Sequence, residues 1–168
     1  MPTGYITPVR ADNDPAQEKV GVLIGGYAKS LYPSNVFDSK HEKWLADCLE
    51  RDAAVLRWVR LPNKQLRIGL SRSGYYPDFV AVVRGSDSSE RHYLLEVKAA
   101  NKCDPTQPDP DVRAKYLAAQ DWVAQANTDG TSGNWRYCLL PDKEVEARRG
   151  SDFFHIIDGA RHLSKSAL

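Results

Sequence analysis

The sequence predicts an α/β fold in which helices flank a central mixed sheet. Three observations predict it: a helical segment over Ser39–Arg51, two valine- and leucine-rich strands around the turn GSDSSER, and a second helical segment over Asp111–Asn127 followed by an apolar strand. A connection through a helix makes neighbouring strands parallel, whereas a hairpin makes them antiparallel. This order of elements therefore predicts a sheet that contains both kinds of pairing.

The first elements are expected after an irregular start. Residues 1–19 contain three prolines and no hydrophobic periodicity, so they are predicted to be a tail or linker, and residues 20–168 one domain. A short strand is expected over Val20–Ile24. The segment Ser39–Arg51 lacks Gly and Pro, and Asp38-Ser39 can cap its N-terminus, which predicts a helix.

Four strands are expected next. Alternating apolar and polar residues predict strands over Val55–Leu61 and Gln65–Leu70, with a turn at Pro62-Asn63-Lys64 between them. Asp78–Val83 and His92–Val97 are apolar segments joined by the polar turn GSDSSER, which suits a hairpin. These two segments are expected to be the central strands.

The C-terminal part completes the sheet and covers one face. Apolar residues near helical spacing predict a helix over Asp111–Asn127. Trp135–Leu140 is expected to return as a strand, Lys143–Arg149 to form a short helix, and Phe153–Ile157 to add an edge strand.

Composition indicates a folded, water-soluble domain. The 168 residues are 42% hydrophobic and 27% charged, which is typical of a globular domain and excludes a wholly disordered chain. No apolar segment is long enough to suggest a membrane span, and no signal peptide is evident, so a cytoplasmic location is expected. The three cysteines lack CxxC spacing, which argues against a disulfide framework and a zinc site.

One segment is basic although the net charge is only +1. Val55–Pro77 contains no acidic residue, so it suits contact with DNA phosphates, and a solvated strand face explains it equally well. Its basic residues are Arg57, Arg60, Lys64, Arg67 and Arg72. Tyr75 and Tyr76 are candidates for stacking on bases, although aromatic residues more often pack in a core.

The strand YLLEVKA carries two charges on one face. Side chains alternate along a strand, so Glu96 and Lys98 point the same way while Leu95 and Val97 point into the opposite layer. Charges among apolar residues are costly unless they are paired or bind a metal. A hairpin around GSDSSER would also bring Asp78 beside Glu96, provided that the strand register puts them on one face.

Two neighbouring carboxylates predict a cation site. They repel each other unless a cation lies between them, and a hard divalent ion such as Mg²⁺ suits oxygen ligands, with Mn²⁺ as a possible substitute. Such an ion polarises a phosphodiester, and a nearby lysine ammonium stabilises developing negative charge. The residues Asp78, Glu96 and Lys98 therefore predict phosphodiester hydrolysis.

The segments YYPDFVAVV and HYLLEVKA resemble the PD-(D/E)xK, or restriction-endonuclease-like, superfamily. This resemblance implies an αβββαβ core and a Mg²⁺-dependent endodeoxyribonuclease in which Asp78, Glu96 and Lys98 are catalytic. The match consists of a Pro-Asp pair at the start of one strand and a Glu-x-Lys at the end of the next.

A narrower resemblance covers roughly residues 25–125. GYAKSLYPSNVFDSKHEKWLADCLE looks like the segment before the nuclease motifs in the C-terminal domains of type III restriction subunits and related helicase-nucleases. The resemblance implies that Glu42 joins the metal ligands and that Lys115 lies near the phosphate. It also implies a restriction or phage-defence context with a fused or separate helicase, translocase or recognition partner. The strand departs from the family in continuing as Ala99-Ala100, where a glycine is common.

Other interpretations stay open at this stage. Glu42 could be a solvated helix residue, Asp78 could simply begin a strand, and Glu96 with Lys98 could be an ordinary ion pair within one strand. A catalytically silent domain that binds nucleic acid or protein would keep the same fold. A transposase-like or junction-resolving nuclease would share the chemistry, and a homodimer could supply the second strand cut.

Overall fold

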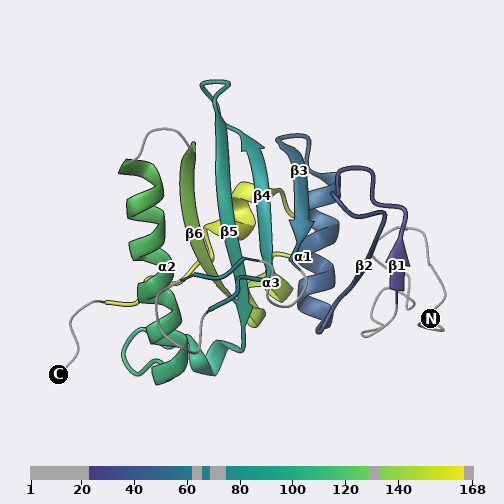
Figure 1. The fold of residues 1–168 in the computed structure, drawn as a ribbon. Helices are drawn as coiled ribbons and strands as arrows, with labels where there is room; N and C mark the ends of the chain where they lie inside the picture. Colours follow the sequence, from purple (N-terminus) through teal and green to yellow (C-terminus); the bar gives the residue numbers. More distant parts are fainter. Residues whose placement is uncertain (1–22, 62–65, 69–74, 129–132, 165–168) are drawn as a thin grey trace.

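The computed structural model describes residues 23–61, 66–68, 75–128 and 133–164, and Figure 1 shows its arrangement. A four-stranded sheet has the order β3-β4-β5-β6. Its strands are β3 (Val55–Arg60), β4 (Phe79–Arg84), β5 (Glu90–Lys98) and β6 (Asn134–Pro141). The two long helices are α1 (Lys40–Arg51), which precedes β3, and α2 (Pro110–Thr128), which connects β5 to β6.

The topology confirms the predicted mixed α/β fold. β3 pairs with β4 and β4 with β5 in antiparallel orientation, and the turn between β4 and β5 makes the hairpin that the sequence predicted. β5 and β6 are parallel, because the chain crosses back through α2 before β6 begins. The order α1, β3, β4, β5, α2, β6 is the αβββαβ arrangement that the sequence predicted.

The two faces of the sheet carry different cores. Leu95 and Val97 of β5 belong to a large core cluster that includes α1, whereas Leu94 belongs to a second cluster with α2. Figure 1 shows α2 alongside β6 and α1 alongside β3. The alternation predicted for the strand YLLEVKA is therefore present, and Glu96 shares the face of Leu94.

Helix α1 begins where the sequence predicted. The Ser39 side chain accepts a hydrogen bond from the backbone N–H of Glu42 at 3.1 Å, which makes Ser39 the N-cap. The apolar side chains of α1 then face the sheet. Its buried residues include Trp44, Leu45 and Leu49, the last two of which are fully buried. Asp52 ends the helix in an extended conformation.

Smaller elements complete the fold. A two-stranded sheet pairs β1 (Leu23–Gly25) with β2 (Ser34–Val36), a strand that the sequence analysis did not predict. The 3-10 helix η2 (Ala100–Lys102) follows β5. The short helix α3 (Asp142–Ala147) follows β6 and confirms the helix expected there.

The edge strand predicted over Phe153–Ile157 is wrong, because these residues form helix α4. The Asp152 side chain accepts a hydrogen bond from the His155 N–H at 2.8 Å and caps the helix. Phe153 and Ile156 are buried three residues apart, which is helical spacing. Their apolar composition fits a strand equally well, so the cap decides the structure.

Two expected elements fall partly outside the described residues. The strand expected over Val20–Ile24 and the one expected over Gln65–Leu70 are each described only in part, and the turn at 62–64 lies outside. Within the second segment, Ile68 forms an isolated antiparallel bridge with Tyr75. No helix in the described part of the chain is long and apolar enough to cross a membrane.

Candidate active site

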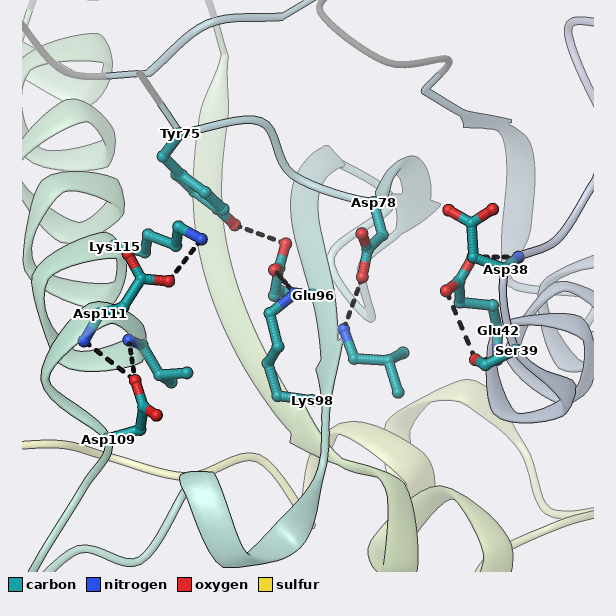
Figure 2. Close-up of polar contacts among 12 residues, drawn as sticks. Asp38, Ser39, Glu42, Tyr75, Asp78, Glu96, Lys98, Asp109, Asp111 and Lys115 are labelled. Atoms are coloured by element: carbon teal, nitrogen blue, oxygen red, sulfur yellow. Dashed lines mark hydrogen bonds and ion pairs between the residues drawn. The ribbon is translucent and has the colours of Figure 1, made fainter. Parts of the chain in front are cut away.

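Asp78 and Glu96 lie beside each other at one end of the central hairpin. Phe79 of β4 pairs with Leu95 of β5, and extending this register by one residue sets Asp78 opposite Glu96. The Asp78 Oδ2 accepts a hydrogen bond from the backbone N–H of Val97 at 2.9 Å. Figure 2 shows Asp78 and Glu96 as neighbours, with Glu96 toward α2 and Asp78 toward Glu42 of α1.

Glu96 is held by two side chains. Only 2% of the residue is exposed. Its Oε1 lies 2.5 Å from the Lys98 Nζ, and its Oε2 accepts a hydrogen bond from the Tyr75 hydroxyl at 2.9 Å. The ion pair within the strand that the sequence left open is thus present. Each oxygen of the carboxylate has one donor, which gives the side chain a defined orientation.

The two carboxylates are difficult to ionise together. Burial and then the charge of Glu96 raise the pKa of Asp78 from 3.8 to about 7. Burial also raises the pKa of Glu96, although Lys98 opposes this change. In the described part of the chain, no ion pair involves Asp78. The Asp78 carboxyl consequently retains its proton to higher pH than usual, and an added cation would favour its ionised form.

Lys98 remains a cation in this environment. Burial of its ammonium group lowers the pKa, but the charges of Glu96, Asp78 and Glu42 outweigh that effect, and the net pKa is raised. Its side chain is 30% exposed, so the group reaches both the buried Glu96 and solvent. An ammonium in this position can stabilise an anion that approaches Asp78 and Glu96.

Glu42 lies on the other side of Asp78 and has local partners (Figure 2). It is only 7% exposed, which excludes the interpretation as a solvated helix residue. Its carboxylate is within 3.4 Å of the Ser39 hydroxyl and 3.3 Å of the Arg60 Nη2. Burial and then the charge of Asp78 raise its pKa, against the opposing effect of Arg60.

The family comparison agrees with this geometry. A family model described as an endonuclease domain matches residues 28–128, which extend from before α1 to the end of α2. The chain belongs to this endonuclease domain family. No curated protein and no solved structure gives a significant match. Family membership makes this domain a nuclease. The matched residues include all of the acidic and lysine residues that the sequence predicted for the active site.

The site of the endonuclease domain offers the oxygen ligands that a hard divalent cation prefers. Asp78 and Glu96 provide neighbouring carboxylate oxygens, which are ligands of this kind. Burial and then the charge of Glu96 raise the pKa of Asp78, and a bound cation would favour its ionised form. The predicted third ligand does not join them in this structure. Among the described residues, no three His, Cys, Asp or Glu side chains converge as a metal-binding group. Glu42 instead faces Ser39 and Arg60.

Lys115 reaches the site from α2. Its ammonium forms an ion pair with Asp111 one helical turn earlier, at 2.6 Å. Its charge also lowers the pKa of Glu96, as a minor contribution. Figure 2 shows Lys115 on the α2 side of Tyr75 and Glu96, so the side chain lies near the carboxylates without contacting them in this structure.

The described residues of the predicted basic segment divide into exposed and buried side chains. Arg57 is 60% exposed at its side chain and pairs with Glu90 at 3.0 Å, and Arg67 is exposed. Arg60, in contrast, is largely buried between Asp38, at 2.6 Å, and Glu42. This arrangement removes Arg60 from the predicted phosphate contacts. Lys64 and Arg72 lie outside the described residues.

The two tyrosines before Asp78 also differ from each other. Tyr75 is only 4% exposed and packs edge-on against Tyr137, so its ring faces are closed to a base in this structure. Tyr76 is half-buried.

Two contacts at the site were missed from the sequence. The contact between the Tyr75 hydroxyl and Glu96 depends on how the chain enters β4, which no local sequence pattern reveals. Arg60 carried a usable signal, because it lies two residues after Trp58 and so shares the face of that bulky ring, which is expected to face the core. An arginine on the core face of a strand requires a buried acidic partner.

Proposed function

We propose that this domain hydrolyses internal phosphodiester bonds of DNA with Mg²⁺ held by Asp78 and Glu96. The observation that carries the proposal is the pair of buried, neighbouring carboxylates beside Lys98, in which the pKa of Asp78 is raised to about 7. A structural ion pair would need one carboxylate for one ammonium. The second carboxylate, which has no ion pair in the described residues, is explained by a divalent cation.

Each residue then has a distinct part in the reaction. A bound Mg²⁺ would supply Lewis acidity and polarise the scissile phosphate. Asp78 and Glu96 hold the ion in a site that the strand register prearranges. Lys98 stabilises the negative charge that develops on the attacking oxygen or the phosphate. Mn²⁺ is a suitable substitute because it accepts the same oxygen ligands.

Glu42 and Lys115 have supporting parts in the proposal. Burial and then the nearby charge of Asp78 raise the pKa of Glu42, and a rotation of Glu42 away from Arg60 would bring a third carboxylate to the ion. Lys115 would exchange Asp111 for a phosphate of the substrate. Arg57, Arg67 and Tyr76 are retained as candidate DNA contacts, with Lys64 and Arg72.

The wider context is also a proposal. We infer that the domain acts as a module of a restriction or phage-defence system, with a helicase, translocase or recognition partner that selects the site of cleavage. The near-neutral net charge supports this inference, because the domain has little general electrostatic attraction for DNA. A homodimer would be an alternative source of the second strand cut.

A cleavage assay tests the proposal. Purified protein would be incubated with supercoiled plasmid, linear duplex and single-stranded DNA, with Mg²⁺, Mn²⁺ or EDTA, alongside Asp78→Ala and Lys98→Ala. The expected result is metal-dependent cutting by the wild type that both substitutions abolish in folded protein. Absence of cutting together with absence of Mn²⁺ binding would favour a catalytically silent domain that binds nucleic acid or protein.

A further inference from the structure

Tyr75 donates a hydrogen bond to Glu96 and has no part in the reaction proposed above. Its hydroxyl donates to the Glu96 Oε2 at 2.9 Å, while the Lys98 ammonium occupies the other oxygen. Lys98 is partly exposed, so its ammonium can move to contact a substrate, whereas the Tyr75 ring is buried. The tyrosine is therefore the fixed partner of this carboxylate.

The backbone and the ring of Tyr75 are both anchored. Its N–H and C=O form two hydrogen bonds with Ile68, at 3.0 and 2.7 Å, which close the loop before β4. Its ring packs against Tyr137 of β6 with centroids 6.3 Å apart, and Tyr137 in turn packs against Tyr116 of α2. The hydroxyl is thereby supported from the sheet and from the helix layer.

Tyr75 and Asp78 attach one loop to the end of β5. The Tyr75 hydroxyl binds the Glu96 side chain, and three residues later Asp78 accepts a hydrogen bond from the next backbone N–H, that of Val97. The same short segment therefore sets the positions of both carboxylates relative to each other. Without the hydroxyl, Glu96 would keep the partly exposed Lys98 as a partner and lose the buried donor that fixes its Oε2.

We propose that Tyr75 is a positioning residue that fixes the orientation of the Glu96 carboxylate beside Asp78, so that both can bind one divalent cation. This inference rests on the proposed function. A hydroxyl donor leaves the second lone pair of Oε2 available, so the hydrogen bond and a metal contact are compatible. Outer contacts of this kind typically change metal affinity by about 10- to 100-fold when they are removed.

The test compares Tyr75→Phe with Tyr93→Phe. Both substitutions remove only a hydroxyl from a buried ring, and the Tyr93 hydroxyl has no hydrogen-bond partner among the described residues. Tyr93 lies on β5 with Glu96 but faces the α1 side. Mn²⁺ binding would be measured by calorimetry, and the Glu96 carboxyl would be followed by carbon-13 NMR in metal-free protein.

For Tyr75→Phe we expect Mn²⁺ binding weaker by about tenfold, a higher metal requirement for cleavage and an unchanged KM for DNA. The Glu96 resonance is expected to titrate at higher pH, because a donor to the ionised form is lost. Tyr93→Phe should match the wild type in all of these measurements. A purely structural role would reduce the folded fraction and leave the metal affinity of the folded protein unchanged.

Two outcomes separate this inference from the proposed function. Equal Mn²⁺ affinity and an equal Glu96 titration in Tyr75→Phe and wild type would overturn the role of Tyr75 while leaving the nuclease proposal intact. Absence of Mn²⁺ binding by the wild type would remove the metal-dependent proposal and, with it, the function assigned to the Tyr75 hydroxyl.

Discussion

Two buried glutamates flank Asp78, and their surroundings differ in kind. Glu42, on α1, has a helix N-cap and Arg60 as partners, so ordinary helix capping accounts for much of its burial. Glu96, on β5, lies within an apolar strand, and its polar partners in the described part of the chain are the side chains of Lys98 and Tyr75. No local backbone requirement explains Glu96. The difference indicates that burial of a charge suggests function most strongly where secondary structure does not account for it.

The largest expected effect concerns the carboxylates without a capping role. Asp78→Asn and Glu96→Gln keep the side-chain shapes and remove the charges, so each should lower metal-dependent cleavage by at least about 100-fold. Asp87→Asn, in the exposed β4–β5 turn, is the matched control and should cleave normally. Cleavage rates of folded protein on plasmid DNA measure the effect. Near-normal activity in Asp78→Asn would contradict its proposed role.

A pH effect on metal-free stability should follow from Asp78. Its pKa is raised to about 7 in the folded protein and is near 3.8 when unfolded, so the neutral form is favoured by folding. The associated stability is present below about pH 4 and is lost as the pH rises through about 7. The raised pKa values of Glu42 and Glu96 act in the same direction.

Urea unfolding in EDTA between pH 5 and 8 checks this prediction. The wild type should lose stability over this range, and Asp78→Asn should show a smaller loss because residue 78 no longer titrates. Addition of Mg²⁺ at pH 8 should stabilise the wild type and leave Asp78→Asn unchanged. Identical pH dependence in the two proteins would show that Asp78 is not the titrating group.

Glu42→Gln should reduce cleavage less than Asp78→Asn or Glu96→Gln does, and it should also reduce stability. It weakens the contacts of a helix cap and leaves Arg60 with Asp38 as its remaining partner, so we expect a loss of about 1 kcal/mol of stability. Activity should fall less than in Glu96→Gln, by about tenfold, if Glu42 supports the site only indirectly. Thermal unfolding and cleavage rates measured together separate the two effects. An activity loss equal to that of Glu96→Gln would make Glu42 a full member of the metal site.

The smallest expected effect belongs to Lys115. Its ion pair with Asp111 is partly exposed and contributes little to stability. Lys115→Ala should weaken DNA binding about threefold, whereas Asp111→Asn should strengthen it by freeing the ammonium for phosphate. The KM for DNA at two salt concentrations measures both variants. A KM that changes in the same direction in both variants would argue against competition between Asp111 and the substrate for Lys115.

The parts of the site that could be predicted from sequence depend on local periodicity. Alternation along YLLEVKA predicted that Glu96 and Lys98 share a face, and Ser39 marked the start of α1. The hydrogen bond between Tyr75 and Glu96 joins residues 21 positions apart, and Tyr75 precedes β4, so no periodic pattern reveals it.

Errors arose where two structures fit the same local pattern. The segment FFHII has the apolar residues of an edge strand, yet the Asp152 cap makes it helix α4. Arg60 was assigned to a basic surface by composition, but its position relative to Trp58 on β3 turns it toward Glu42. Net charge along a segment does not distinguish the two faces of a strand.

The central claim is that Asp78 and Glu96 together bind one divalent cation. Calorimetric titration of Mn²⁺ into wild type, Asp78→Asn, Glu96→Gln and Glu42→Gln at pH 7.5, on the order of half a unit above the raised pKa of Asp78, tests it most directly. We expect binding by the wild type, loss of binding in Asp78→Asn and Glu96→Gln, and weakened binding in Glu42→Gln. Equal binding by all four proteins would contradict it, because the ion would then lie elsewhere.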